Sequence, residues 1–307
     1  MDYSGTKEKK DTAQKDFMAF PDITADTINV LLYQGRKLVD AGDLWAGPTE
    51  SFYQGREKLR DQYEDLCKYE LKDGNVRIMY LIANQSAVDG KMLLRKAGYT
   101  GGAYREQYEG KTQDIFPVIE FVLYWGEPGW RSGRDIRRLF SRRKLPEETW
   151  RYIDDLKLHV YEMRHLPREI RERFQSDMRI VVDFLAEGIG YRSDRKIVHK
   201  AALIRMIKVL SGESDTGNIE DWLEKKGIRE EDEITVCELF DQYVRQGREE
   251  GKAEGRLEGR AEGQFEGRTR QLVEDIERTM EFFHVTLEKA CESLGITVSR
   301  YEEAKKI

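Results

Sequence analysis

The sequence contains few cysteines and no long apolar run. Only three of its 307 residues are cysteines, Cys67, Cys237 and Cys291. Their odd number and wide spacing fit neither a disulfide framework nor a zinc site. No run approaches the roughly 18 apolar residues of a membrane-spanning helix, and residues 1–16 lack the apolar core of a signal peptide. We therefore expect a reduced, cytoplasmic protein without a membrane segment.

Proline is also scarce, with six residues in the chain, and many segments are rich in Leu, Glu, Arg and Lys. This composition favours a largely helical protein. The chain has 5 Trp, 15 Tyr and 12 Phe, an aromatic content that excludes disorder over its whole length. Its length allows one to three domains of roughly 100–200 residues each.

The charge is unevenly distributed along the chain. The formal net charge is −6, yet residues 131–144 carry seven basic residues and one acid. Such a run is typical either of a solvated surface or of a local nucleic-acid footprint, and charge alone favours the solvated surface. The arginines that would contact DNA in the second interpretation are Arg134, Arg137, Arg138, Arg142 and Arg143.

The first half of the chain alternates helical and strand patterns. Apolar residues at helical spacing predict a helix over 17–40, and the Gly, Pro and Ser content of 41–56 predicts a loop. Two apolar runs at 65–71 and 76–84 flank an Asp-Gly turn, which is a strong hairpin signal. A helical segment and the apolar strand 115–125 follow.

The order α, β, β, α, β predicts an α/β fold with a small mixed sheet flanked by helices. After about residue 160 the sequence shows only helical stripes, so the C-terminal half is expected to be all-helical. The last two short helices flank Gly295 and form a weak helix-turn-helix pattern.

Residues 247–267 form a repeat with glycine at every fourth position, preceded by Glu from Gly251 onward. Each helical glycine costs about 1 kcal/mol relative to alanine, so the segment is either a flexible linker or a helix stabilised by a partner. Arg and Glu rows flank the glycine row on opposite sides, and these rows are complementary in a parallel pair. We expect a parallel homodimer through 247–270, with a right-handed crossing because the period exceeds 3.6 residues. The glycines that would form this contact include Gly251, Gly255, Gly259 and Gly263.

Metal-dependent phosphodiester cleavage needs clustered carboxylates, and a hairpin can supply them. One strand offers an acid, and positions i and i+2 of the next strand point to the same face. A two-residue turn places Glu64 opposite position 83, whereas a three-residue loop or a bulge places Asp65 there. A slip of one residue exchanges the two faces, and the residues alone leave Glu64 and Asp65 about equal.

Several segments resemble the Rpn family, the recombination-promoting nuclease or transposase branch of the PD-(D/E)XK nucleases. LIANQS at 81–86 is similar to the family signature (L/I)-x-E-x-Q-S, and FPVIEFVLYWGEPGW at 116–130 is similar to LPVITLVLYxGxxxW. The other matching segments are TADTINVLLYQGRKLVDAGDL at 24–44, QYEDLCK at 62–68, VDGKMLLRKAGYTGGAYREQYE at 88–109 and the glycine repeat. The resemblance implies a PD-(D/E)XK core and a Mg²⁺-dependent (or Mn²⁺-dependent) DNA endonuclease.

The resemblance also implies roles for individual residues. Asp65 would be the metal-binding aspartate, and this match favours it over Glu64. Asn84 would offer its backbone carbonyl to the metal, and Gln85 would replace the usual Lys beside the attacking water. Asp26 would add an outer acidic group, and Gln107 would line the site from a helix.

Position 83 departs from the family pattern, because Ala83 stands where the pattern has a metal-binding Glu. An alanine cannot bind Mg²⁺, so this copy is expected to be a weak nuclease or an inactive one. The sequence leaves open whether the Glu was replaced deliberately or is naturally absent. The alternative function is a non-catalytic, oligomeric DNA-binding or regulatory protein that keeps the fold. Arg95 and Lys96 are further candidates for DNA contacts.

These inferences divide the chain into five parts. They are a flexible N-terminus at 1–16, a nuclease-like domain at 17–160, a helical region at 161–246, the oligomerisation segment at 247–270 and a helical tail at 271–307.

Overall fold

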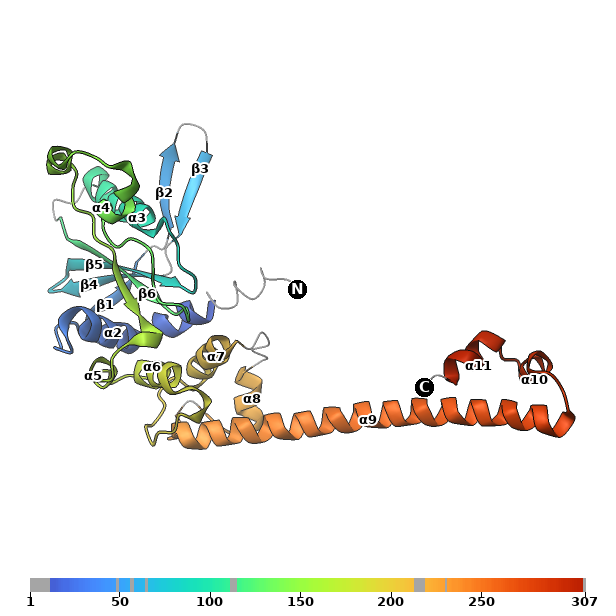
Figure 1. Cartoon of the computed structure of the whole chain (residues 1–307). Helices are drawn as coiled ribbons and strands as arrows, with labels where there is room; N and C mark the ends of the chain where they lie inside the picture. The colour runs from blue at the N-terminus through green and yellow to red at the C-terminus, as the bar shows by residue number, and fades with distance from the viewer. Residues whose placement is uncertain are drawn as a thin grey trace. The chain divides into compact units, whose positions relative to one another are not determined.

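The computed structural model describes residues 12–47, 50–55, 58–63, 66–110, 115–212, 219–229 and 231–305 (Figure 1). The chain forms two compact units, one that ends at Val236 and one that begins at Cys237. Each unit is described by itself. The narrower predicted boundaries at 160, 246 and 270 stay predictions.

The first unit contains a five-stranded mixed sheet in the order β1-β4-β5-β6-β7. Neighbours are antiparallel from β1 to β5 and parallel from β5 to β7. The strands are β1 (Leu44–Ala46), β4 (Leu66–Lys72), β5 (Asn75–Gln85), β6 (Val118–Tyr124) and β7 (His159–Glu162). The predicted α/β class with a small mixed sheet is therefore confirmed.

The hairpin between β4 and β5 has a two-residue turn and a bulge. Asp73 and Gly74 have φ angles of 53° and 82°, the left-handed backbone that such a turn requires. Next to the turn Leu71 lies opposite Val76, but Glu70 lies opposite Ile78, so β5 has one additional residue at this step. The predicted bulge is thus present, and the last described pair of the ladder is Leu66 with Ile82.

Helices cover the two faces of the sheet (Figure 1). Helix α2 (Pro21–Tyr33) lies on one face, where the hydroxyl groups of Tyr33 and Tyr80 are 3.2 Å apart. Helix α3 (Met92–Glu109) lies on the other face, where Tyr99 packs in a cluster with Leu81. Side chains of β5 alternate between these faces, so Leu81, Ala83 and Gln85 belong to the α3 face.

Three parts of the sequence prediction were wrong in detail. The helix expected over 17–40 is divided, because residues 12–19 are helical, Phe20 bends the chain and α2 ends at Tyr33. The loop expected over 41–56 contains β1 and the strand β2 (Glu50–Gly55), which pairs with β3 (Lys58–Tyr63) in a separate two-stranded sheet. Residues 159–162 lie at the start of the half that was expected to be all-helical, but they form the strand β7. They are a strand because they pair in parallel with β6.

A long connection, residues 125–158, joins β6 to β7 and contains the whole basic run 131–144. We call it the basic connection. It includes the helix α4 (Ile136–Leu139) and the 3-10 helices η2 (Ser141–Arg143) and η3 (Glu147–Tyr152). Trp130 and Ile136 of this connection belong to the same buried cluster as Ala83 and Met92. The basic connection therefore packs on the α3 face of the sheet.

After β7 the first unit is helical. Helix α6 buries the apolar stripe that includes Val181 and Val182, and α7 buries Leu203 and Ile207. The elements in chain order are η4 (Met163–His165), α5 (Arg168–Arg171), α6 (Met178–Glu187), η5 (Gly188–Gly190), α7 (Lys200–Ser211) and α8 (Ile219–Lys225).

The second unit consists of one long helix and two short ones. Helix α9 (Val236–Phe283) has 48 residues and includes the whole glycine repeat. Its last turns pack against α10 (Leu287–Ser293) and α11 (Val298–Ala304) around Ile276 and Cys291. Among the described residues, no helix has the length and apolar content needed to cross a membrane.

Candidate functional site

The first candidate position, Ala83, lies on the α3 face of β5 and is only 4 % exposed. It is opposite Val122 of the parallel strand β6 and shares a buried cluster with Met92 and Leu93 at the start of α3. Its methyl group suits these apolar neighbours and offers no ligand atom. A Glu in this position would bring a carboxyl group into this apolar cluster.

The neighbouring candidates lie at the C-terminal end of β5. Gln85 is half-buried, lies opposite Tyr124 and shares the face of Ala83 two residues earlier. Asn84 points to the opposite face, where its side-chain Oδ1 accepts a hydrogen bond of 2.9 Å from Trp125 Nε1. The role assigned to the Asn84 backbone carbonyl stays a prediction, as does the role of Gln85.

Asp65, the predicted metal ligand, lies outside the described residues, as does Glu64. Within the part of the chain that the structure describes, no group of three or more His, Cys, Asp or Glu side chains could hold a metal ion. The residues described around Ala83 therefore do not fit Mg²⁺ by themselves.

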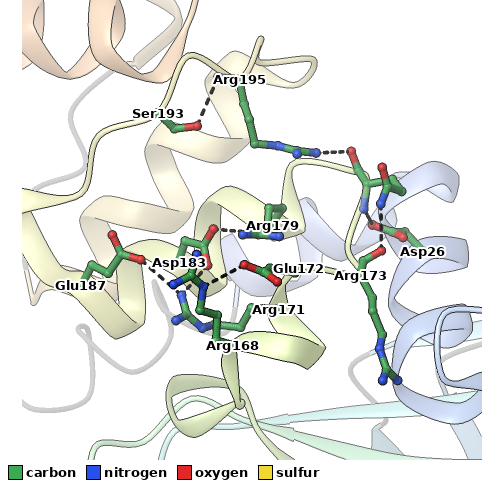
Figure 2. Close-up of polar contacts among 11 residues, drawn as sticks. Asp26, Arg168, Arg171, Glu172, Arg173, Arg179, Asp183, Glu187, Ser193 and Arg195 are labelled. Carbon is green, nitrogen blue, oxygen red and sulfur yellow. Dashed lines mark hydrogen bonds and ion pairs between the residues drawn. The ribbon is translucent and has the colours of Figure 1, made fainter.

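Asp26 is engaged on the other side of the sheet (Figure 2). Its Oδ2 accepts hydrogen bonds from the backbone nitrogens of Gln175 and Ser176, both at 2.8 Å, and from Ser176 Oγ at 2.7 Å. These contacts join α2 to the segment before α6. Because α2 and α3 cover opposite faces, the structure does not bring Asp26 together with Ala83 and Gln85.

Figure 2 also shows a group of arginines before and within α6, three of which pair with acidic side chains. Arg171 and Arg179 both bind Asp183, whose side chain is only 6 % exposed. Arg168 pairs with Glu172 at 2.8 Å. The Arg171–Asp183 pair joins α5 to α6, whereas the other two pairs link residues four positions apart in the sequence. These arginines therefore stabilise the helical region.

Gln107 lies at the far end of α3 from Ala83. Its Oε1 accepts a hydrogen bond of 3.0 Å from the backbone nitrogen of Phe116, and nearby Tyr104 accepts one of 3.2 Å from Val118. Val118 lies four residues before the partner of Ala83 on β6, which is about 13 Å along a strand. In this structure Gln107 anchors the beginning of β6 and is not close to Ala83.

The sequence interpretation missed Glu120, a buried carboxyl group on the same face as Ala83. It lies opposite Leu81 and is 3 % exposed. Thr100 Oγ1 donates a hydrogen bond of 2.8 Å to its Oε2, and Oε1 has no partner among the described residues. Burial raises the pKa of Glu120 to about 7, although the Thr100 hydrogen bond and the nearby Lys96 oppose the rise. The sequence does carry a signal for this residue, since Glu120 is the one charged residue in the apolar run 115–125. Charged residues are rarely buried without a partner.

The two basic candidates on α3 differ in their environment. Arg95 binds Asp89 at 3.2 Å and the hydroxyl of Tyr99 at 3.0 Å, and its side chain remains 42 % exposed. Lys96 is half-buried near Glu120. Arg95 is therefore the more accessible of the two for a phosphate.

The basic connection holds its arginines in two different ways. Arg134 binds Glu162 of β7 at 2.5 Å, and Arg137 binds Glu147 at 3.0 Å. The guanidinium of Arg137 also lies over the ring of Trp150, 5.2 Å from its centre. The other predicted DNA contacts are exposed, namely Arg138, Arg142 and Arg143.

The glycine repeat is helical, with Gly251, Gly255, Gly259 and Gly263 all within α9. At Gly263 and Gly267 an added Cβ would meet no atom within 4 Å. Contacts of α9 within the described chain therefore do not explain why these positions are glycine.

Comparison with known proteins gave one match. The family described as "Putative transposase, YhgA-like" matches residues 8–209, about two thirds of the chain. No curated protein and no solved structure matched.

Proposed function

Because the chain belongs to the YhgA-like transposase family, we propose that it is a DNA endonuclease of the Rpn type in which Ala83 impairs cleavage. In this proposal the protein binds DNA through the basic connection. Binding is retained, and hydrolysis of the phosphodiester is slow or absent.

One buried cluster carries the proposal. It includes Ala83 of β5, Met92 and Leu93 of α3, and Trp130 and Ile136 of the basic connection. The position of the missing Glu and the arginine-rich segment are thus parts of one packed layer. DNA held by that segment would lie on the same side of the sheet as position 83.

The charge of the basic connection supports DNA as the ligand. Residues 125–158 contain nine basic and six acidic residues, a net charge of 9 − 6 = +3, although the whole chain is acidic. Exposed arginines bind phosphates without reading the base sequence. We therefore expect affinity for unrelated DNA sequences, with a strong dependence on salt.

A binding measurement tests this proposal without relying on cleavage. The full chain is titrated into labelled 20-base-pair duplexes of unrelated sequence, with Ca²⁺ in place of Mg²⁺, and fluorescence anisotropy is recorded at several salt concentrations. The proposal predicts similar affinities for the duplexes and a falling affinity with salt. Absence of binding at low salt contradicts it and favours a regulatory protein that does not contact DNA.

The unexplained glycines favour one further property, self-association. Gly263 and Gly267 leave an open strip on α9, and small residues allow two helix backbones to approach closely. We propose that two copies pair in parallel through 247–270, because Arg and Glu rows then face each other across the glycine strip.

A further inference from the structure

Tyr152 is an exposed aromatic residue in the basic connection. Its side chain is 90 % exposed, at the last position of the 3-10 helix η3. No hydrogen bond, ion pair or ring contact of Tyr152 occurs among the described residues. Tyrosine usually lies at least partly buried, where its ring contributes to packing. Packing within the chain therefore does not explain this ring.

The backbone on both sides of Tyr152 is anchored. Trp150 and Ile153 are partly buried and pack against the cluster that contains Ala83. The backbone nitrogen of Ile153 also donates a hydrogen bond of 3.4 Å to the Trp150 carbonyl. The ring is thus presented by a fixed segment, which lowers the entropy lost when a ligand stacks on it.

Charged side chains of both signs surround η3, because Glu147, Glu148, Asp154 and Asp155 are exposed beside its cations. Arg137 lies over the ring of Trp150 and binds Glu147, so α4 runs beside η3. Arg151 is exposed next to Tyr152, and Arg142, Arg143 and Lys144 are exposed in the preceding turn. The excess of cations lies in the preceding run 131–144, with seven basic residues and one acid. An exposed ring beside such a run is the arrangement that binds unpaired nucleotides, because bases stack on the ring and the backbone contacts the cations.

We propose that Tyr152 is a stacking platform for an unpaired base, so that the basic connection binds single-stranded DNA or a frayed DNA end. This inference rests on the proposed DNA binding and adds the class of DNA. Intact duplex would contact the arginines alone, because its bases are not available for stacking on Tyr152.

The test compares variants on three DNA ligands. The ligands are a 20-nucleotide thymidine strand, the same strand with abasic sites in its central part, and a 20-base-pair duplex. The variants of the full chain are Tyr152→Ala and Tyr152→Phe, and Tyr108→Ala is the matched control. Tyr108 is 88 % exposed on the last turn of α3, so it is an equally exposed tyrosine outside the basic connection.

We expect Tyr152→Ala to weaken binding of the thymidine strand about 5- to 100-fold, the range of one base–aromatic stack. Its duplex affinity should change less than twofold. Tyr152→Phe and Tyr108→Ala should bind the strand like the unmodified chain, and the abasic strand should remove the difference between Tyr152→Ala and the unmodified chain.

Two results would overturn the stacking proposal while leaving DNA binding in place. The first is an unchanged affinity of Tyr152→Ala for the thymidine strand. The second is an equal loss on strand and duplex, which would mean that Tyr152 acts on phosphate contacts instead of a base. If the unmodified chain binds none of the three ligands, this proposal and the proposed function are both contradicted.

Discussion

Thr100 of α3 donates a hydrogen bond of 2.8 Å to Glu120 of β6. This contact connects the helix to a carboxyl group in the interior of the sheet, on the same face as Ala83.

Glu120 predicts a specific dependence of stability on pH. Its pKa is about 7 in the folded protein, above the value of about 4.3 for an exposed Glu. The folded state therefore binds more protons between these values, so the contribution of Glu120 to stability is fully present below pH 4 and is lost as pH rises through 7. Above pH 8 the buried charge should cost roughly 4 kcal/mol of folding free energy.

Glu120→Gln tests this effect, because the amide keeps an acceptor for Thr100 and cannot ionise. Urea unfolding should show similar free energies for the variant and the unmodified chain near pH 4, and a more stable variant at pH 8.5. Glu109→Gln is the control, since Glu109 is exposed and paired with Arg105. A variant that is less stable than the unmodified chain at pH 8.5 contradicts the interpretation of Glu120 as a buried acid.

The phosphate contacts of the basic connection can be counted from a salt dependence. Arg142 and Arg143 are exposed in η2, so Arg142→Glu with Arg143→Glu should leave the fold intact. Each lost contact with duplex DNA should flatten the slope of log K against log salt by about 0.9, or about 1.8 for the pair. Anisotropy titrations at several salt concentrations measure the slope. Arg168→Glu in α5 is the control. An unchanged slope in the double variant would mean that the basic run is a solvated surface and does not contact DNA.

The glycine repeat should determine the oligomeric state. Sedimentation of the full chain should give a dimer, and a chain that ends at Gln246 should give a monomer. Equal monomer masses for both chains would contradict the pairing.

The direction of pairing can be tested with one new cysteine near the end of the repeat. Gly251→Cys in a Cys237→Ser background should form a disulfide between copies under mild oxidation, because equal residue numbers meet in a parallel pair. In an antiparallel pair position 251 would meet the other end of the repeat, and no such disulfide would form.

Local patterns predicted the elements that they encode directly. The hairpin was predictable from the Asp73-Gly74 turn and the apolar runs on either side of it. Strand β6 was predictable from the apolar run that ends at Trp125. Strand β7 has four residues and exists because β6 offers a parallel edge, so its sequence alone gives a weak signal. The sequence also could not show that Asp26 binds the segment before α6, because the contact joins residues about 150 positions apart.

The site was predictable only in part for the same reason. Periodicity placed Ala83 and Gln85 on one face, and the family pattern drew attention to position 83. The environment of Glu120 depends on where α3 packs, which brings Thr100 over a strand 20 residues away in sequence. No pattern in the strand itself encodes that packing.

The most direct test of the central claim is plasmid nicking by Ala83→Glu in Mg²⁺. Position 83 is 4 % exposed, so Ala83→Gln serves as a control of similar volume without the charge, and thermal unfolding checks that both variants fold. We predict that Ala83→Glu nicks supercoiled DNA in Mg²⁺ and not in Ca²⁺. The unmodified chain, Ala83→Gln and Ala83→Glu with Asp65→Ala should leave the plasmid intact. A folded Ala83→Glu variant that binds Mg²⁺ and DNA but does not cut would contradict the claim that the missing Glu is what impairs this chain as a nuclease.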